Sequence, residues 1–205
     1  MKILKLHNGD KAAVKTAIKK LNSGGTLIFP TPTCYGLGAS ILKSRAVRNI
    51  YCIKKRDTGK PLSIIVNNVK LFRKYGKYYD LISKIIKKYP SELFTFVVNS
   101  NKRPPYFLES KPDYAGIMIA RDGVHSALVK GLGHPIVGTS ANISGKKECY
   151  NIQEVIEQFG RRKIKPDLVL DGGDLPKNKP SVIIKILDND NFEVLRYGNI
   201  KKISV

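Results

Sequence analysis

The chain has 205 residues, of which 42% are hydrophobic, and this length and composition allow one substantial buried core. Its formal net charge of +21 produces a field that attracts polyanions such as nucleotides or RNA, although lysines spread over helix surfaces would give the same total. No apolar run approaches the roughly 18 residues of a membrane span and the first residues lack the layout of a secretory signal, so we expect one cytoplasmic domain over residues 1–205, with no membrane contact.

Strands and helices are predicted to alternate along the chain, without repeats. Asp10 is placed to cap a first helix that ends at residues 24–25, where two glycines stand together. The short apolar segment 26–29 follows as a strand. Two prolines then prevent its continuation, so residues 31–38 are predicted to form a loop at a strand's carboxyl end, where open α/β sheets usually place their sites.

The rest of the chain continues this alternation. Ser44 is predicted to cap a helix that runs out into the loop 54–61, and Asn151 with Glu154 has the pattern of a capping box. Further helices are predicted at 68–74, 80–88, 124–131 and 151–159, and strands at 62–66, 94–98, 115–120, 135–138, 167–171, 181–187 and 192–196. The last two strands indicate a hairpin, so the predicted fold is α/β with helices packed on a mixed sheet.

A basic cluster of Lys54, Arg56 and Lys60 lies in a loop punctuated by glycine and proline. The planar fork of arginine and the compact charge of lysine suit phosphate oxygens, and they stabilise charge on a transferred phosphoryl or adenylyl group. Cations at a solvated helix C-terminus are also favoured by the helix dipole. The cluster alone leaves both interpretations open.

A second segment, residues 138–145, carries three hydroxyls and one amide directly after an apolar strand. Such neutral donors and acceptors orient a ligand without adding charge. An ordinary helix cap or Asx/ST turn has the same composition, so this segment alone is also ambiguous.

Standard catalytic templates fail on spacing. The glycines at 36 and 38 do not continue into GxGxxG, and no GxxxxGK[ST] occurs, so a phosphate site here is nonstandard. The three histidines lie far apart, no GxSxG is present, and three cysteines without metal or disulfide spacing support neither a zinc site nor a disulfide framework. No candidate for covalent catalysis is visible, and Cys34 is typical of a small packing residue.

Several short segments occur in one order across nearly the whole chain. They are residues 24–25, 30–38, Lys54 with Arg56 and 60–62, 94–98, Arg121 with His125, 140–145, 171–173, 180–181 and 195–198. This ordered set resembles the YrdC-like threonylcarbamoyl-AMP synthases, which serve the modification of tRNA to threonylcarbamoyladenosine, in their short single-domain form. Each motif is weak alone, but unrelated solvated loops would not assemble the complete pattern.

The resemblance implies a twisted open sheet curved around a positively charged concave cavity that holds L-threonine, bicarbonate and ATP with Mg²⁺. The amine and bicarbonate would form a carbamate whose oxygen attacks the α-phosphorus of ATP, which releases pyrophosphate and leaves threonylcarbamoyl-AMP. No protein nucleophile is needed, so catalysis would depend on positioning and charge neutralisation. A threonylcarbamoyl transferase acting on tRNA is implied as the downstream partner.

The same resemblance assigns roles to individual residues. The catalytic set, which also contacts ATP, is expected to be Lys54, Arg56, Ser140 and Asn142, and ATP binding would also involve Lys60 and Arg196. Contacts to threonine are expected from Thr33, Tyr35, Arg121 and Ser181. Structural hydrogen bonds would equally explain Thr31, Thr139 and His125. Mg²⁺ is expected to bridge ATP phosphates with few protein ligands, because no acidic cluster is visible.

Departures from the family pattern concern the amino-acid substrate. Pro32 stands where an acidic residue is usual, residues 91–93 replace Pro-Gly-Pro, Gly123 replaces a proline, and Val182 replaces a threonine. A related enzyme acting on another carbamoyl adenylate is therefore one alternative. A noncatalytic protein whose basic cavity binds tRNA or double-stranded RNA is another.

Overall fold

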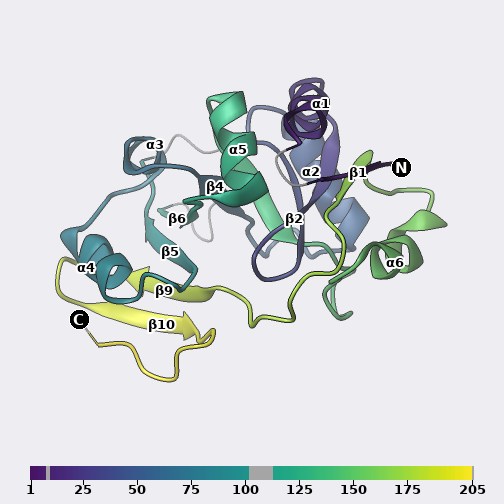
Figure 1. Cartoon of the computed structure of the whole chain (residues 1–205). Coiled ribbons are helices and arrows are strands. Elements are labelled where there is room, and N and C mark those ends of the chain that lie inside the picture. Colours follow the sequence, from purple (N-terminus) through teal and green to yellow (C-terminus); the bar gives the residue numbers. More distant parts are fainter. Residues whose placement is uncertain (8–9, 102–112, 205) are drawn as a thin grey trace.

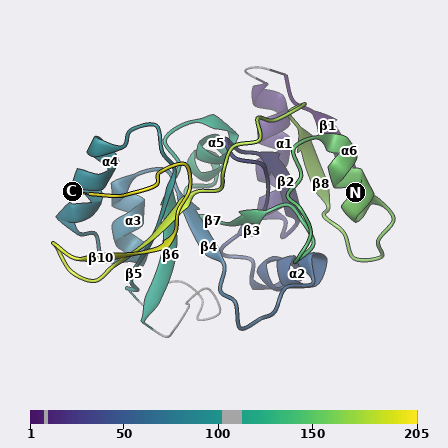
Figure 2. The same cartoon turned by 90° about the horizontal axis from the view of Figure 1, so that it is seen from below.

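The computed structural model describes residues 1–7, 10–101 and 113–204, and these form one mixed sheet of ten strands. The strand order across the sheet is β1-β8-β2-β3-β7-β4-β6-β5-β9-β10. Figure 2 shows the sheet from β1 at one side to β10 at the other. The strands are β1 (Lys2–Lys5), β2 (Thr26–Pro30), β3 (Tyr35–Ser40), β4 (Ser63–Val66), β5 (Phe94–Asn99), β6 (Tyr114–Ile119), β7 (Ile136–Ser140), β8 (Leu168–Asp171), β9 (Val182–Ile186) and β10 (Phe192–Arg196). Since β1 and β10 are the two edges, the chain termini lie at opposite ends of the molecule (Figure 1).

The sheet combines parallel and antiparallel neighbours. Four pairs are parallel, namely β1 with β8, β2 with β8, β4 with β6, and β5 with β9, and the other pairs are antiparallel. Strands β9 and β10 form the predicted hairpin. The predicted α/β class with a mixed sheet is therefore confirmed.

Six α-helices cover parts of this sheet in the portion of the chain that the structure describes. Helix α1 packs against α5 and β2, α2 packs against β3, and α3 packs against β6. Their bounds are α1 (Lys11–Asn22), α2 (Ser44–Lys54), α3 (Val69–Tyr75), α4 (Asp80–Lys88), α5 (Gly123–Leu132) and α6 (Ile152–Val155), and α6 continues as a π-helical segment, Ile156–Gly160. None of these described helices combines the length and apolar character that crossing a membrane requires.

The helix caps follow local chemistry. Asp10 accepts a hydrogen bond from the Ala13 N–H at 2.9 Å, and α1 ends before Gly24, which adopts φ +83°. Asn151 accepts one from the Glu154 N–H at 2.9 Å. These two of the three predicted caps are confirmed, although the Glu154 carboxylate bonds to the Tyr150 N–H instead of completing the box on Asn151.

The structure corrects the predicted loop at residues 31–38. Only residues 31–34 connect the strands, because β3 begins at Tyr35 and pairs antiparallel with β2. A strand rich in glycine lacks the usual β signal, but here the absent side chains have a packing reason. A Cβ on Gly38 would lie 3.0 Å from the ring of Phe29.

Smaller differences concern element ends. Lys43 is the N-cap residue of α2 and Ser44 is the first helical residue. Strand β7 extends to Ser140, beyond the predicted 135–138. Strand β1 was not predicted, because an edge strand of four residues that is mostly exposed carries little hydrophobic pattern.

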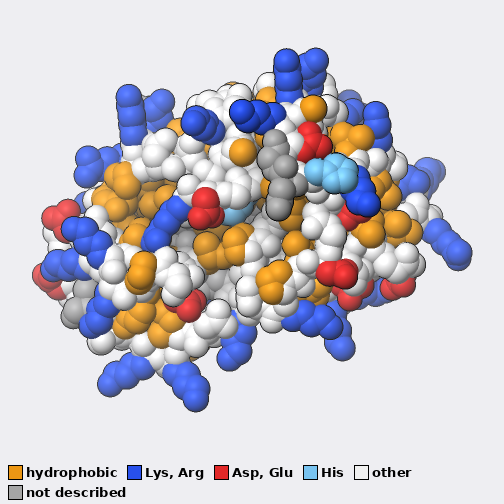
Figure 3. All heavy atoms as spheres, in the orientation of Figure 1, with side chains coloured by type: hydrophobic (Ala, Val, Ile, Leu, Met, Phe, Trp, Pro, Cys, Tyr) orange, Lys and Arg blue, Asp and Glu red, His pale blue; other side chains and the backbone are white. Residues whose placement is uncertain are grey.

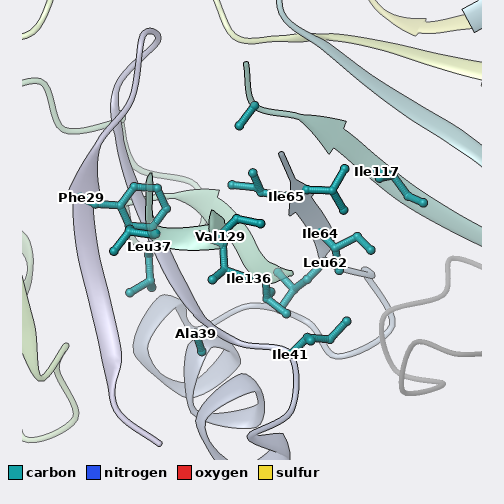
Figure 4. Close-up of a cluster of buried hydrophobic side chains, with 14 of the residues drawn as sticks. Phe29, Leu37, Ala39, Ile41, Leu62, Ile64, Ile65, Ile117, Val129 and Ile136 are labelled. Carbon is teal, nitrogen blue, oxygen red and sulfur yellow. The ribbon is translucent and has the colours of Figure 1, made fainter. Parts of the chain in front are cut away.

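The core lies between the sheet and its helices. Figure 4 shows one part of it, where Val129 of α5 lies among Phe29, Ile65 and Ile136 of the sheet. Lysine and arginine side chains project from all around the face seen in Figure 3, without gathering into a single track. The high charge is thus widely distributed on this face.

Candidate functional site

A cavity of about 470 Å³ lies on one face of the sheet. Residues opposite each other in paired strands project to the same face, and the pairing links Phe29 to Gly36 and Gly36 to Ser140. The same register continues to the other edge, so one face supplies Phe29, Gly36, Gly138, Ser140, Ser63, Ile65, Gly116, Met118, Thr95, Val97, Ile183 and Arg196 to the lining.

Glycines keep the floor of this cavity low. Gly36, Gly116 and Gly138 all stand at lining positions. A Cβ on Gly116 would lie 2.8 Å from the Ser63 Oγ, and one on Gly36 would lie 3.2 Å from the Phe29 ring. Larger residues at these positions would therefore displace the floor as well as fill the space above it.

The structure brings most of the predicted site residues to this cavity. Eight of them line it, from segments that are far apart in the chain: Thr31, Thr33, Arg56, His125, Thr139, Ser140, Ser181 and Arg196. Five do not, namely Lys54, Asn142, Lys60, Tyr35 and Arg121. Each of these five has a structural reason for its different placement.

Lys54 lies behind the wall, at the end of α2, and is 2% exposed. Its Nζ donates to the carbonyl oxygens of Ser140 at 2.5 Å and Asn142 at 2.7 Å, and to the Oδ1 of Asn142 at 2.9 Å. Burial, followed by the charge of Arg56, lowers the pKa of Lys54 to about 8. Three of the four residues in the predicted catalytic set thus form one hydrogen-bonded cluster.

Arg56 occupies the rim beside this cluster. Its Nε donates to the carbonyl oxygen of Lys60 and its Nη2 to that of Pro61, both at 3.0 Å. Two backbone anchors hold the planar guanidinium at the cavity wall. Lys60 contributes its carbonyl oxygen to this arrangement, whereas its side chain is exposed.

Arg196 and Ser181 form a second polar group where β9 and β10 meet the cavity. The Arg196 guanidinium donates from Nε to the Ser181 carbonyl oxygen at 3.0 Å and from Nη2 to the Ser181 Oγ at 3.1 Å. The Ser181 hydroxyl also lies 3.2 Å from that of Thr95. Arg56 and Arg196 therefore stand in the same lining, each anchored by protein oxygens.

The connection between β2 and β3 contributes hydroxyls. Thr31 donates from Oγ1 to the Cys34 carbonyl oxygen at 2.6 Å, and its Oγ1 lies 3.2 Å from that of Thr33. Burial raises the pKa of Cys34 to about 11, so this thiol stays protonated at neutral pH. Its burial agrees with the predicted packing role.

Tyr35 points away from the cavity because side chains alternate along β3 and its neighbour Gly36 faces the floor. Its hydroxyl donates to the Gly173 carbonyl oxygen at 2.9 Å and accepts from the Gly172 N–H at 2.9 Å. Burial raises its pKa to about 12. Tyr35 thus holds the segment that follows β8.

Arg121 lines a second cavity of about 300 Å³ that shares Thr33 and Ser181 with the larger one. Its guanidinium donates from Nη1 to the Pro90 carbonyl oxygen at 2.7 Å. Arg56 lines the larger of these two cavities and not the smaller one, so Arg56 and Arg121 belong to different linings.

Two further lining residues stand out by their chemistry. His125 is 2% exposed, its Nδ1 has no hydrogen-bond partner among the described residues, and burial lowers its pKa. Glu148 was not predicted, because it lies just outside the 140–145 motif, yet it is the acidic residue among those that line the larger cavity in the described chain. Its place in the site follows from the fold, which brings it into the cavity lining.

This chain is similar in sequence to proteins of one known family. The model of the Sua5/YciO/YrdC family, described as telomere recombination, matches residues 19–198. A threonylcarbamoyl-AMP synthase of Chromobacterium violaceum is 30% identical over 181 residues, 88% of this chain and 90% of that protein. A protein of Methanocaldococcus jannaschii that carries the same name provisionally is 35% identical over 201 residues, 98% of this chain and 93% of that one.

Solved structures show the same fold. Sua5 of P. abyssi in complex with L-threonine has a TM-score of 0.84 and 25% identity over 96% of this chain, which spans 57% of the length of that one. YciO of E. coli has a TM-score of 0.81 and 23% identity, with 97% of this chain and 95% of that one covered, and this likeness concerns the fold. Because the family model and the M. jannaschii relative both match most of its length, this chain belongs to the Sua5/YciO/YrdC family.

Proposed function

We propose that this chain is a threonylcarbamoyl-AMP synthase, which converts L-threonine, bicarbonate and ATP into threonylcarbamoyl-AMP, pyrophosphate and water. The observation that carries the proposal is one cavity whose wall combines Arg56, Ser140, Ser181 and Arg196 from distant segments. Its volume of about 470 Å³ is within the usual range for small-molecule sites. The relatives from C. violaceum and M. jannaschii carry this activity in their names.

The proposed chemistry needs no protein nucleophile. The threonine amine and bicarbonate form a carbamate with loss of water. An oxygen of this carbamate attacks the α-phosphorus, the bond to the β,γ-diphosphate breaks, and pyrophosphate leaves with the electron pair. Arg56 and Arg196 neutralise phosphate charge from anchored positions, which avoids reorganisation during the reaction. Cys34 is not suited to nucleophilic attack, since its pKa of about 11 keeps it protonated.

Mg²⁺ is proposed to accompany ATP. The described residues contain no group of three His, Cys, Asp or Glu side chains that could hold a metal ion. Glu148 offers one hard oxygen ligand in the lining, and this fits an ion that is held chiefly by phosphate oxygens and water. The ion would supply charge neutralisation on the phosphates.

The product is a reactive mixed anhydride of a carbamate and AMP. We propose that a transferase consumes it to form threonylcarbamoyladenosine on tRNA, and that both steps occur in the cytoplasm. The amino-acid selectivity of this chain is part of the proposal, because Pro32 and Leu93, two positions at which the family pattern is altered, line both cavities.

The test is pyrophosphate release by the purified wild-type chain with ATP, L-threonine, bicarbonate and Mg²⁺. We expect release that requires each of the three substrates, and threonylcarbamoyl-AMP detectable by mass spectrometry. L-Serine and L-valine in place of L-threonine would define the selectivity. No ATP turnover with threonine and bicarbonate would contradict the proposal.

A further inference from the structure

The ammonium group of Lys54 is fully occupied by protein oxygens. Its three hydrogen bonds end on the Ser140 carbonyl oxygen, the Asn142 carbonyl oxygen and the Asn142 Oδ1, at 2.5, 2.7 and 2.9 Å. An ammonium has three protons and no acceptor, so these contacts use every donor. The side chain also lies outside the walls of both cavities. In this arrangement Lys54 has no proton left for a phosphate oxygen.

Asn142 links Lys54 to Ser140, because its Oδ1 accepts a hydrogen bond from each of them. The Asn142 Nδ2 faces two carbonyl oxygens, those of Ile143 at 3.2 Å and Lys146 at 2.7 Å, which can only accept. These partners and the Lys54 ammonium together set the orientation of the amide. The Oδ1 therefore faces the Ser140 Oγ at 2.6 Å as an acceptor, and Ser140 must donate its single hydroxyl proton to it.

The backbone around this cluster is held as well. The Ser144 N–H donates to the Lys54 carbonyl oxygen at 2.8 Å, and the Ala141 N–H donates to that of Tyr35 at 2.7 Å. The Ile143 N–H donates to the Gln158 side chain at 2.9 Å. Hydrogen bonds to α2, β3 and Gln158 therefore hold the turn after β7 in place. This fixed backbone keeps the Asn142 amide where it accepts the Ser140 proton.

Ser140 lines the cavity with an oxygen whose proton is directed at Asn142. We propose that Lys54 is a positioning residue that acts through Asn142 to make Ser140 a pure acceptor facing the cavity. Ser140 then meets a hydrogen-bond donor or cation of the bound substrates in place of a phosphate oxygen. The identity of those substrates rests on the proposed function, in which the amino and hydroxyl groups of threonine, a ribose hydroxyl and Mg²⁺ have this chemistry.

The direct test is a crystal structure of the wild-type chain with L-threonine, a nonhydrolysable ATP analogue and Mg²⁺. We expect the Lys54 Nζ to keep its three protein oxygens, and the Ser140 Oγ to contact an N–H, an O–H or the metal ion. The atom found there distinguishes the candidate groups. A Lys54 Nζ bonded to a phosphate oxygen, or a Ser140 Oγ against one, would overturn the proposal.

Kinetics give an independent test through Lys54→Met, Ser140→Ala and the double variant. Because both residues act in one network, we expect each single change to lower kcat by at least about tenfold, and the double variant to be little worse than the poorer single one. The KM for ATP should change by less than about threefold. Multiplying losses, or a rise in the KM for ATP with kcat unchanged, would show that Lys54 contacts ATP independently.

Lys55→Met is the matched control, since Lys55 is the next residue, is exposed and carries the same charge. It should retain the wild-type rate. Thermal melting checks that each variant is folded, and if Lys54→Met does not fold, the crystal structure alone decides. An inactive wild type would contradict the proposed function, whereas the hydrogen-bond arrangement would still be confirmed or refuted by a structure of the chain without substrates.

Discussion

Arg56 combines a charge with a fixed position at the cavity wall. Backbone carbonyl oxygens hold its Nε and Nη2, so little side-chain entropy remains to be lost on binding an anion. We expect Arg56→Ala to lower kcat/KM for ATP by at least about a hundredfold, measured as pyrophosphate release. Arg56→Lys should not restore the rate, because lysine cannot keep both anchors. Lys87→Ala removes an exposed charge on α4 and should leave the rate unchanged.

His125 couples folding to pH. Burial lowers its pKa, and the charge of Asp122 opposes this effect only partly. Near pH 6.5 the unfolded chain takes up a proton that the folded chain resists, so the stability contribution is fully present above about pH 6.5 and is lost as the pH falls below it. We expect His125→Gln to lose less thermal stability than the wild type between pH 7 and pH 5. Equal losses in the two melting series would argue against this coupling.

At the scale of elements, one side chain joins β3 to the segment after β8. Tyr35 bonds to Gly172 and Gly173, and it faces away from both cavities. We expect Tyr35→Phe to lower the free energy of unfolding by about 0.5–1.5 kcal/mol, since the half-buried Gly172 N–H and the carbonyl oxygen of the exposed Gly173 lose their hydrogen-bond partner. The KM for threonine should stay close to the wild-type value. A large rise in that KM in a variant of normal stability would instead support the threonine contact inferred from the family resemblance.

Elements with a strong local signal were predicted well, and those defined by a distant partner were not. The Asp10 and Asn151 caps depend on neighbours three residues away, and both are confirmed. Most of strand β3 was predicted as a loop because two prolines end the strand before it, whereas β3 is held in the sheet between β2 and the distant β7. Strand β1 exists through its pairing with β8, which is more than 160 residues away in the sequence.

At the scale of the whole molecule, charge is the dominant feature. The net charge of +21 is distributed over the face seen in Figure 3, and Arg56 is a single charge at the rim of the cavity. If RNA binds, we expect its affinity to fall steeply between low and physiological salt, and Arg56→Ala to leave it nearly unchanged. Fluorescence anisotropy with a tRNA at several salt concentrations measures both effects. A selective loss of RNA affinity in Arg56→Ala would place RNA in the cavity and favour the noncatalytic alternative.

The residue types of the candidate site could be predicted from the sequence, but the placement of each side chain could not. Basic residues in the 54–60 segment suited phosphate and neutral polar residues at 138–145 suited the orientation of a ligand, but each segment alone was ambiguous, and only the order of the motifs indicated the family. Which of these side chains reach the cavity could not be inferred, because that depends on strand alternation and on whether a neighbouring carbonyl oxygen is within reach. Glu148 and the second cavity beside Arg121 had no local signal at all.

The sequence by itself determined the α/β class, the family and the residue types that the chemistry needs, since these depend on periodicity, caps and an ordered set of motifs. Only the tertiary structure decided which of these residues reach the cavity and which support it from outside. Strand register places Ser140 and Arg196 on the cavity face and Tyr35 away from it. Burial against three oxygens places Lys54 behind the wall, because a desolvated ammonium is stable only where every proton has an acceptor.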